Sequence, residues 1–311
     1  MEEIEATYAD HRLDVEALQR QLDTRVFGVG DRLLYLPVVD STNIVAMQLA
    51  HKRPEEGVVV LTDSQTAGKG RLGRRWVDVA RRNVLSSIVL RPLFAPHLLV
   101  MIASLAVVDT IAETCSIAAT IKWPNDVLIK ECKVAGILIE TSHDSQGRLI
   151  AVLGIGVNVY GRSKDLQVGT ALSSVRSQDE RTTNQRHTLQ TTQAASHTMA
   201  TTLESECGQR VGRELFIARL LQHIETDYLA LQEEALDNST VASSYGSLSR
   251  WIRERWRSSL STLGRPIQVR QGEQLINGIA EDVDDSGELL LRRHSGELVS
   301  ITWGDIGHST W

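Results

Sequence analysis

The 311-residue chain lacks the features that mark several large classes of protein. Its three cysteines, Cys115, Cys132 and Cys207, form no CxxC pair and no disulfide framework, which suits a reducing compartment. No apolar run reaches the roughly 20 residues that a membrane span needs, and the acidic N-terminus lacks the basic and apolar regions of a signal peptide. With a net charge of −6, indiscriminate binding of nucleic acid by the whole surface is not expected. We therefore expect a cytoplasmic protein with no membrane partner.

Two catalytic signatures are also missing. The sequence contains no G-x-S-x-G motif, which carries the nucleophile of serine hydrolases, and no H-E-x-x-H motif, which binds zinc. Its nine histidines are scattered along the chain. A serine-nucleophile mechanism and a transition-metal site are therefore not expected.

What is present is a series of short apolar segments that alternate between helix and strand character. After a peripheral helix around 9–22, we expect strands at 32–39, 58–65, 83–92, 119–123, 126–129, 133–141 and 149–159, and helices at 41–52, 96–115, 213–234 and 247–260. Ser41 or Thr42 is expected to cap the helix at 41–52 through its side-chain oxygen. Closely spaced strands between helices predict an α+β fold with a mixed β-sheet flanked by helices.

Composition divides the chain further. Residues 173–206 hold 17 Ser, Thr or Gln among 34 positions, so a mobile polar insertion is the expectation there, with a polar surface helix over 190–206 as the alternative. After the segment LGRP at 263–266, short strands separated by turns predict a small β-barrel. We expect a larger domain over residues 1–260 and a small domain over 263–311.

A glycine- and arginine-rich stretch follows the strand at 58–65. It matches G-x-G-x-x-G at Gly68, Gly70 and Gly73, but Arg74, Arg75 and Trp76 follow where a dinucleotide-binding fold would open a helix. Residues 68–82 carry six Lys or Arg against one Asp. Such a loop can clamp a phosphate or carboxylate through guanidinium groups and turned backbone amides. A solvated basic loop is the alternative.

Three more segments could carry chemistry. KWPND, Lys122 to Asp126, is either a plain hairpin turn or a cluster of polar groups able to hold a nucleotide or Mg²⁺. Lys133 precedes an apolar strand, where its amine must either reach solvent or meet an anion. In GIGVNV, Gly154 and Gly156 weaken a strand unless something approaches its backbone closely.

Taken together, these segments resemble the biotin protein ligase family, also called biotin–[acetyl-CoA-carboxylase] ligases. The matching motifs are STN (41–43), QTAGKGRLGRRW (65–76), KWPND (122–126), KVAGILIE (133–140) and GIGVNV (154–159), in the family's order. The resemblance implies a catalytic domain like that of class II aminoacyl-tRNA synthetases and a C-terminal SH3-like β-barrel. It also implies that biotin and ATP, with Mg²⁺, form biotinyl-5′-AMP, which is then transferred to a lysine of a biotin carboxyl carrier protein.

The resemblance assigns roles by motif position. It gives Lys133 and Arg71 catalytic roles, with Asp126 as a magnesium ligand. Biotin would contact Ser41, Thr42, Asn43, Gln65, Gly68, Lys69, Arg71, Lys133, Gly136 and Gly156. ATP would contact Arg71, Arg74, Trp76, Asn125, Asp126, Lys133 and Asn158.

The sequence departs from the family pattern in three places. Lys69 stands where the glycine loop usually has Arg, which matters little if that residue acts through its backbone. The polar insertion is longer than expected. Only 40 residues precede Ser41, fewer than the roughly 60 of a winged-helix DNA-binding domain, so a monofunctional ligase without DNA binding is expected.

Two other functions compete with this one. A lipoate–protein ligase shares the fold and the adenylate chemistry, but its RRxSGGG-type run is missing here. A non-catalytic biotin-binding regulator would lack the cationic clamp that Arg71, Arg74 and Lys133 supply. A homodimer is left open, because edge strands of a mixed sheet could pair two subunits.

Overall fold

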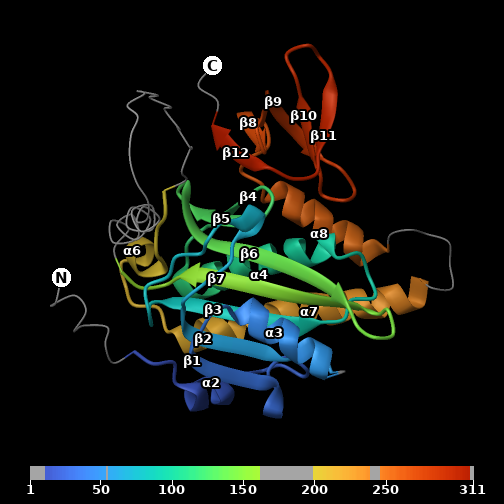
Figure 1. Ribbon diagram of the computed structural model, residues 1–311. Coiled ribbons are helices and arrows are strands. Elements are labelled where there is room, and N and C mark those ends of the chain that lie inside the picture. Colours follow the sequence, from blue (N-terminus) through green and yellow to red (C-terminus); the bar gives the residue numbers. More distant parts are fainter. Residues whose placement is uncertain (1–10, 54, 162–198, 239–245, 309–311) are drawn as a thin grey trace, which may run out of the picture.

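The structure is a computed structural model that describes residues 11–53, 55–161, 199–238 and 246–308. A seven-stranded sheet in the order β1-β2-β3-β7-β6-β5-β4 forms its centre, with only the β1–β2 pair parallel (Figure 1). Its strands are β1 (Leu33–Val39), β2 (Val59–Gln65), β3 (Asn83–Leu90), β4 (Thr120–Lys122), β5 (Asp126–Ile129), β6 (Cys132–His143) and β7 (Leu149–Asn158). The helices are α2 (Val15–Gln21), α3 (Thr42–Lys52), α4 (His97–Cys115), α6 (Leu203–Cys207), α7 (Arg213–Asn238) and α8 (Ser247–Ser258). The mixed sheet flanked by helices confirms the expected α+β class.

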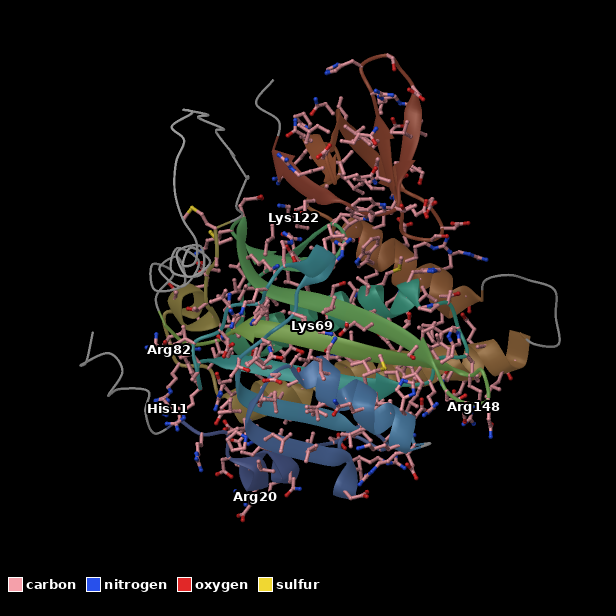
Figure 2. The ribbon with its side chains drawn as sticks, in the orientation of Figure 1. His11, Arg20, Lys69, Arg82, Lys122 and Arg148 are labelled. Atoms are coloured by element: carbon pink, nitrogen blue, oxygen red, sulfur yellow. The ribbon has the colours of Figure 1, made fainter. Side chains whose placement is uncertain are left out.

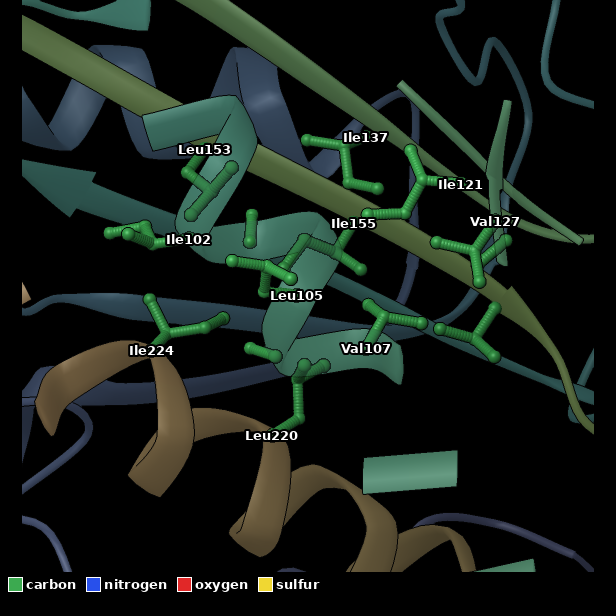
Figure 3. Close-up of a cluster of buried hydrophobic side chains, with 14 of the residues drawn as sticks. Ile102, Leu105, Val107, Ile121, Val127, Ile137, Leu153, Ile155, Leu220 and Ile224 are labelled. Atoms are coloured by element: carbon green, nitrogen blue, oxygen red, sulfur yellow. The ribbon is translucent and has the colours of Figure 1, made fainter. Parts of the chain in front are cut away.

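Alternating side chains bury both faces of the sheet. Along β7, Leu153 and Ile155 pack with α4 and α7 in the main core, of which Figure 3 shows Leu105 on α4 and Leu220 on α7. Ile150 and Val152, which point to the opposite face of the same strand, join a smaller cluster under α3. Because the side chains of a strand alternate between faces, each face of the sheet carries every second residue of the strand. The α3 face is the one on which the cavity described below lies.

Helix α4 is long and apolar enough to cross a membrane, with a mean hydropathy of 1.9 over its most apolar window. Of that window, 67% is buried inside the fold. Leu99, Ile102 and Val107 on this helix are fully buried in the main core. The helix therefore owes its composition to a position between the sheet and α7, as Figure 1 shows.

The end of the polar stretch differs from the expectation. Residues 173–198 lie outside the described residues, but the last residues of the stretch, up to 206, are built into the domain. Thr201, Thr202 and Leu203 are fully buried, and Thr202 caps α6 by accepting from Ser205 N at 3.1 Å. The Lys133 amide donates to Met199 O at 2.7 Å, and Thr201 N donates to Lys133 O at 2.9 Å. The expectation of a mobile insertion is therefore wrong for residues 199–206, and of the alternative helix over 190–206 the described residues show the part from Leu203 on, in α6.

The two edges of the large sheet differ in how they are covered. On β4, Ile121 N donates to Ser259 O at 2.9 Å and Ser261 N donates to Ile121 O at 2.8 Å, so the segment after α8 pairs with this edge. The other edge is β1, where Pro37 has no amide to donate.

A second, antiparallel sheet follows α8 and lies at one end of the first (Figure 1). Its strands run in the order β11-β10-β9-β8-β12: β8 (Pro266–Gln271), β9 (Gln274–Val283), β10 (Leu289–Arg292), β11 (Leu298–Ile301) and β12 (Asp305–His308). Among the described residues β11 and β12 do not pair, so the expected closed barrel is an open five-stranded sheet. The Trp123 indole Nε1, from the KWPND turn, donates to Gly287 O at 2.9 Å and ties the two sheets together.

Candidate active site

Three glycines create a cavity on the α3 face of the large sheet. Gly156 of β7 pairs with Gly136 of β6, and Gly154 lies two residues before Gly156 on the same face. A Cβ at Gly156 would lie 2.7 Å from the Trp76 ring, and a Cβ at Gly154 would lie 2.2 Å from Asn43 Oδ1. Trp76 and Asn43 therefore approach the strand backbone closely at these glycines, which explains why glycine stands there although it weakens a strand. The cavity above them has a volume of about 150 Å³.

One end of the cavity is polar but uncharged. Gln65 Oε1, at the end of β2, accepts from Thr42 N at 2.9 Å. Ser87 Oγ on β3 lies 2.7 Å from Thr42 Oγ1 and 2.6 Å from Asn43 Oδ1. Ser41 is the N-cap of α3, as expected, but its side chain does not make the expected capping hydrogen bond. Gln65 satisfies the free amide instead, because the end of β2 brings it to the first turn of α3.

The other end is charged. Asp126 on β5 pairs with Gly136 in the sheet register, and its Oδ1 accepts from Lys133 Nζ at 2.6 Å. Arg71 Nη1 donates to Asn125 Oδ1 at 3.0 Å, and Asn125 Nδ2 donates to Ile137 O at 2.7 Å. The KWPND turn is thus more than a hairpin, because it supplies a carboxylate and an amide that hold two cations over the cavity.

Burial shapes the electrostatics of this end. Burial lowers the pKa of the Arg71 guanidinium, and the charge of Asp126 opposes that change. Burial likewise lowers the pKa of Lys122, again opposed by Asp126. An arginine stays protonated even so. Desolvated cations that outnumber the nearby carboxylate attract an anion more strongly than the same groups would in water.

The glycine-arginine loop forms one wall of the cavity. Gly70 N donates to Arg74 O at 2.7 Å and Trp76 N donates to Gly68 O at 2.9 Å, so the loop folds back on itself and opens no α-helix. Lys69 and Arg74 line the cavity together with Arg71. Figure 2 places Lys69 in front of the middle of the large sheet. The arrangement favours the anion clamp over the solvated basic loop.

Trp76, at the end of the loop, covers the glycine floor. Its ring contacts the positions of both Gly136 and Gly156, and Lys133 Nζ lies 5.7 Å from the ring centroid. The buried indole Nε1 has no hydrogen-bond partner within the described part of the chain. The indole therefore lies against the glycine positions, and its Nε1 donor is buried.

The cavity brings together nearly all the residues that the sequence singled out. Its lining includes every predicted site residue except Gly68 and Asn158. Gly68 lies behind the loop, where a Cβ would be 2.8 Å from Trp76 O. Asn158 is buried, and its Nδ2 donates to Thr201 O at 3.2 Å. Gly68 thus packs against the backbone of the loop, and Asn158 binds the segment before α6. Neither residue lies on the cavity surface.

The sequence analysis missed residues that support the lining. Ser87 holds Thr42 and Asn43, and Glu140 contacts both Asn43 and Lys69. Glu140 carried one available signal, which is a carboxylate inside the apolar strand segment KVAGILIE. Ser87 lay within a uniformly buried strand and gave no such signal.

Acidic groups around the cavity are few in the described part of the chain. Among the described residues, no group of three or more His, Cys, Asp or Glu side chains could hold a metal ion. Asp126 is the acid that lines the cavity within this part of the chain, and it is paired with Lys133. Mg²⁺ commonly binds through one carboxylate together with substrate phosphates, so this donor set fits a magnesium ion that arrives with a nucleotide.

Comparison with known proteins agrees with this geometry. Residues 35–158 match the biotin/lipoate A/B protein ligase family, and residues 262–309 match the biotin protein ligase C-terminal domain. The chain is 34% identical over 265 residues to the biotin–[acetyl-CoA-carboxylase] ligase of Paracoccus denitrificans, covering 84% of this chain and 94% of that one. It is 31% identical over 271 residues to the bifunctional ligase/repressor BirA of Bacillus subtilis, covering 86% and 71% respectively. The Aquifex aeolicus biotin protein ligase, solved with biotin and ATP, superposes with a TM-score of 0.60 at 26% identity, covering 88% of this chain and 97% of that one.

Proposed function

The chain belongs to the biotin protein ligase family, and we propose that its cavity joins biotin to ATP and then to a lysine of a biotin carboxyl carrier protein. The observation that carries the proposal is the polarity of the cavity, which is uncharged at the Thr42–Gln65 end and cationic at the Lys133–Arg71 end. Biotin has the same polarity, with a neutral ureido ring at one end and a carboxylate at the other. The chain is an ATP-dependent biotin ligase, and lipoate ligation and a non-catalytic role are not favoured.

Biotin would lie across the glycine floor. The ureido group offers two N–H donors and one carbonyl acceptor, which match the hydroxyl and amide groups of Thr42, Asn43 and Gln65. Its apolar rings would pack against the Trp76 indole, which itself lies over Gly136 and Gly156. The carboxylate would then point toward Lys133.

The first half-reaction brings two anions together. An oxygen of the biotin carboxylate attacks the α-phosphorus of ATP, the bond to the β-phosphate oxygen breaks, and pyrophosphate leaves. Lys133 and Arg71 lower the repulsion by placing positive charge beside both groups, and this charge is fixed before the reaction. Asn125 keeps the Arg71 guanidinium in place through the hydrogen bond at 3.0 Å.

Magnesium would accompany the nucleotide. We propose that Asp126 contributes one carboxylate oxygen toward it and that Arg74, Asn125 and Trp76 line the nucleotide side of the cavity. The ion would neutralise the phosphate oxygens and the departing pyrophosphate. When ATP binds, Lys133 would exchange its contact with Asp126 for the α-phosphate.

In the second half-reaction, the ε-amine of the carrier lysine attacks the carbonyl carbon of biotinyl-5′-AMP. The bond to the AMP oxygen breaks and the new amide nitrogen loses a proton. We place this reaction in the cytoplasm, since the chain has no disulfide pair and the acceptor is a carboxylase subunit. No residue of the chain becomes covalently modified in either step.

ATP–pyrophosphate exchange by the purified protein tests this proposal. The assay is run separately with biotin, lipoate and octanoate. Exchange that requires biotin is the expected result. Exchange with lipoate alone would assign the chain to the lipoate branch, and no exchange despite biotin binding by calorimetry would leave only the regulator function.

Breaking the ion pair between Arg74 and Asp305 is expected to have a small effect on the KM for ATP. Arg74 Nη2 lies 2.6 Å from Asp305 Oδ1 on β12, so the C-terminal sheet holds the nucleotide-side arginine. Asp305→Asn should raise the KM for ATP about threefold, since half-exposed ion pairs contribute modestly. Initial rates of pyrophosphate exchange at varied ATP give this value. Glu281→Gln, which removes an ion pair to Arg292 in the same sheet, is the matched control and should leave the KM unchanged.

A further inference from the structure

We infer that Glu140 is a positioning residue that fastens the glycine-arginine loop to the first turn of α3 and thereby sets the affinity for biotin. The inference rests on the proposed function and extends it to a residue outside the cavity lining. Glu140 lies on β6, four residues after Gly136, on the same face of the strand. It is part of the wall of a second hollow of about 630 Å³, which the loop forms together with Leu138.

The two carboxylate oxygens of Glu140 bind two different elements. Oε2 accepts from Asn43 Nδ2 of α3 at 2.8 Å, and Oε1 accepts from Lys69 Nζ of the loop at 2.9 Å. Asn43 is buried with 4% of its surface exposed, whereas Lys69 and Glu140 keep 40% and 32% of their side chains exposed. One carboxylate therefore joins the first turn of α3 to the glycine-arginine loop.

Asn43 transmits this contact into the cavity. Its Oδ1 lies 2.6 Å from Ser87 Oγ, so both ends of its amide are engaged. An amide held at both ends presents a fixed edge to a ligand. If Glu140 is removed, Asn43 Nδ2 loses its partner while still buried, which is costly.

Lys69 gives the contact a function in placing the loop. A flexible ammonium at this position can form a single strong contact with a carboxylate, and its pairing with Glu140 draws residues 68–76 toward the sheet. The Lys69 side chain therefore has a role beyond that of its backbone. Glu140 is the partner of the lysine that replaces the family's usual arginine.

Two substitutions at one position separate the two contacts. Glu140→Gln keeps an oxygen for Asn43 but removes the charge facing Lys69, and should raise the KM for biotin about threefold, as for a partly exposed ion pair. Glu140→Ala removes both contacts and should raise it about tenfold or more, because a buried amide loses its partner. In both variants kcat for exchange should stay within about twofold, since neither contact touches the reacting atoms.

A double-variant test assigns the charge effect to Lys69. Lys69→Met should match Glu140→Gln in KM, and the combination of both should be no worse than either alone, because the two changes remove the same ion pair. Lys69→Arg should retain most of the affinity. Glu131→Gln, which breaks an exposed ion pair with Arg265 at 2.9 Å away from the cavity, is the matched control.

Biotin affinity measured by calorimetry distinguishes a failure of the proposed function from a failure of the role given to Glu140. Wild-type protein that binds no biotin would overturn the proposed function and the role of Glu140 together. Wild-type protein that binds biotin, with Glu140→Ala binding equally well at unchanged thermal stability, would overturn the role of Glu140 alone. A fall in kcat at unchanged KM would also overturn it, because a positioning residue for biotin acts on the KM.

Discussion

Replacing Lys133 with alanine is expected to lower the rate of biotin-dependent pyrophosphate exchange by about 10³, because one preorganised charge facing the transition state is removed. Its amine lies 2.6 Å from Asp126 and beside the Trp76 ring, over the charged end of the cavity. The Lys133 side chain is 27% exposed, so the variant should fold normally. Single-turnover formation of biotinyl-5′-AMP measures the loss directly.

Two comparisons make this result specific. Lys52→Ala is the matched control, because it removes an exposed lysine at the C-terminal end of α3. The rate of exchange should stay unchanged in this variant. Lys133→Arg keeps the charge but not the compact ammonium, and should recover part of the rate. If Lys133→Ala retained more than about one tenth of the wild-type rate, another group would have to supply the charge for adenylation.

Replacing Gly154 with alanine is expected to raise the KM for biotin roughly 10- to 100-fold, because the new methyl group forces buried polar groups apart. The added Cβ would lie 2.2 Å from Asn43 Oδ1 and 2.9 Å from its Cγ, closer than any tolerated contact. Asn43 must then move and lose its contacts with Ser87 and Glu140. Exchange kinetics at varied biotin, supported by calorimetry, give the change.

Gly212→Ala is the matched control for this substitution. Gly212 has no positive φ, and the nearest atom to an added Cβ is Leu215 Cβ at 3.9 Å, so the methyl group makes only an ordinary van der Waals contact. The KM should not change in this variant. An unchanged KM in Gly154→Ala would mean that Asn43 does not contribute to biotin binding.

The sequence alone predicted most of the elements, and all but two of the residues assigned to the site line the cavity. Helices and strands followed from apolar periodicity because a buried face repeats every 3.6 residues in a helix and every 2 in a strand. The site followed from motifs such as KWPND and GIGVNV, whose polar residues and glycines have no use in a plain sheet. The local excess of positive charge around Arg71 gave the sign of the ligand.

Other features depended on segments far apart in the chain. The cap of α3 comes from Gln65, and Asn158 faces Thr201, because the sheet places strand ends beside elements that the sequence separates. Strand β12 was not expected, since its pairing with β8 across 35 residues leaves no local pattern. The link from Arg74 to Asp305 has the same origin.

The predicted features and the unpredicted ones differ in how far apart along the chain the residues involved lie. Local patterns report whether a residue is buried, turned or charged, and these properties determined the fold class and the positions of the cationic loop and the strand glycines, while leaving the choice between an anion clamp and a solvated loop open. Which carboxylate binds which cation is decided only when strands are placed in register, since Glu140 meets Lys69 and Asn43 from positions 71 and 97 residues away. The tertiary structure therefore decided the partners, because hydrogen bonds need atoms about 3 Å apart and no spacing along the chain fixes that distance.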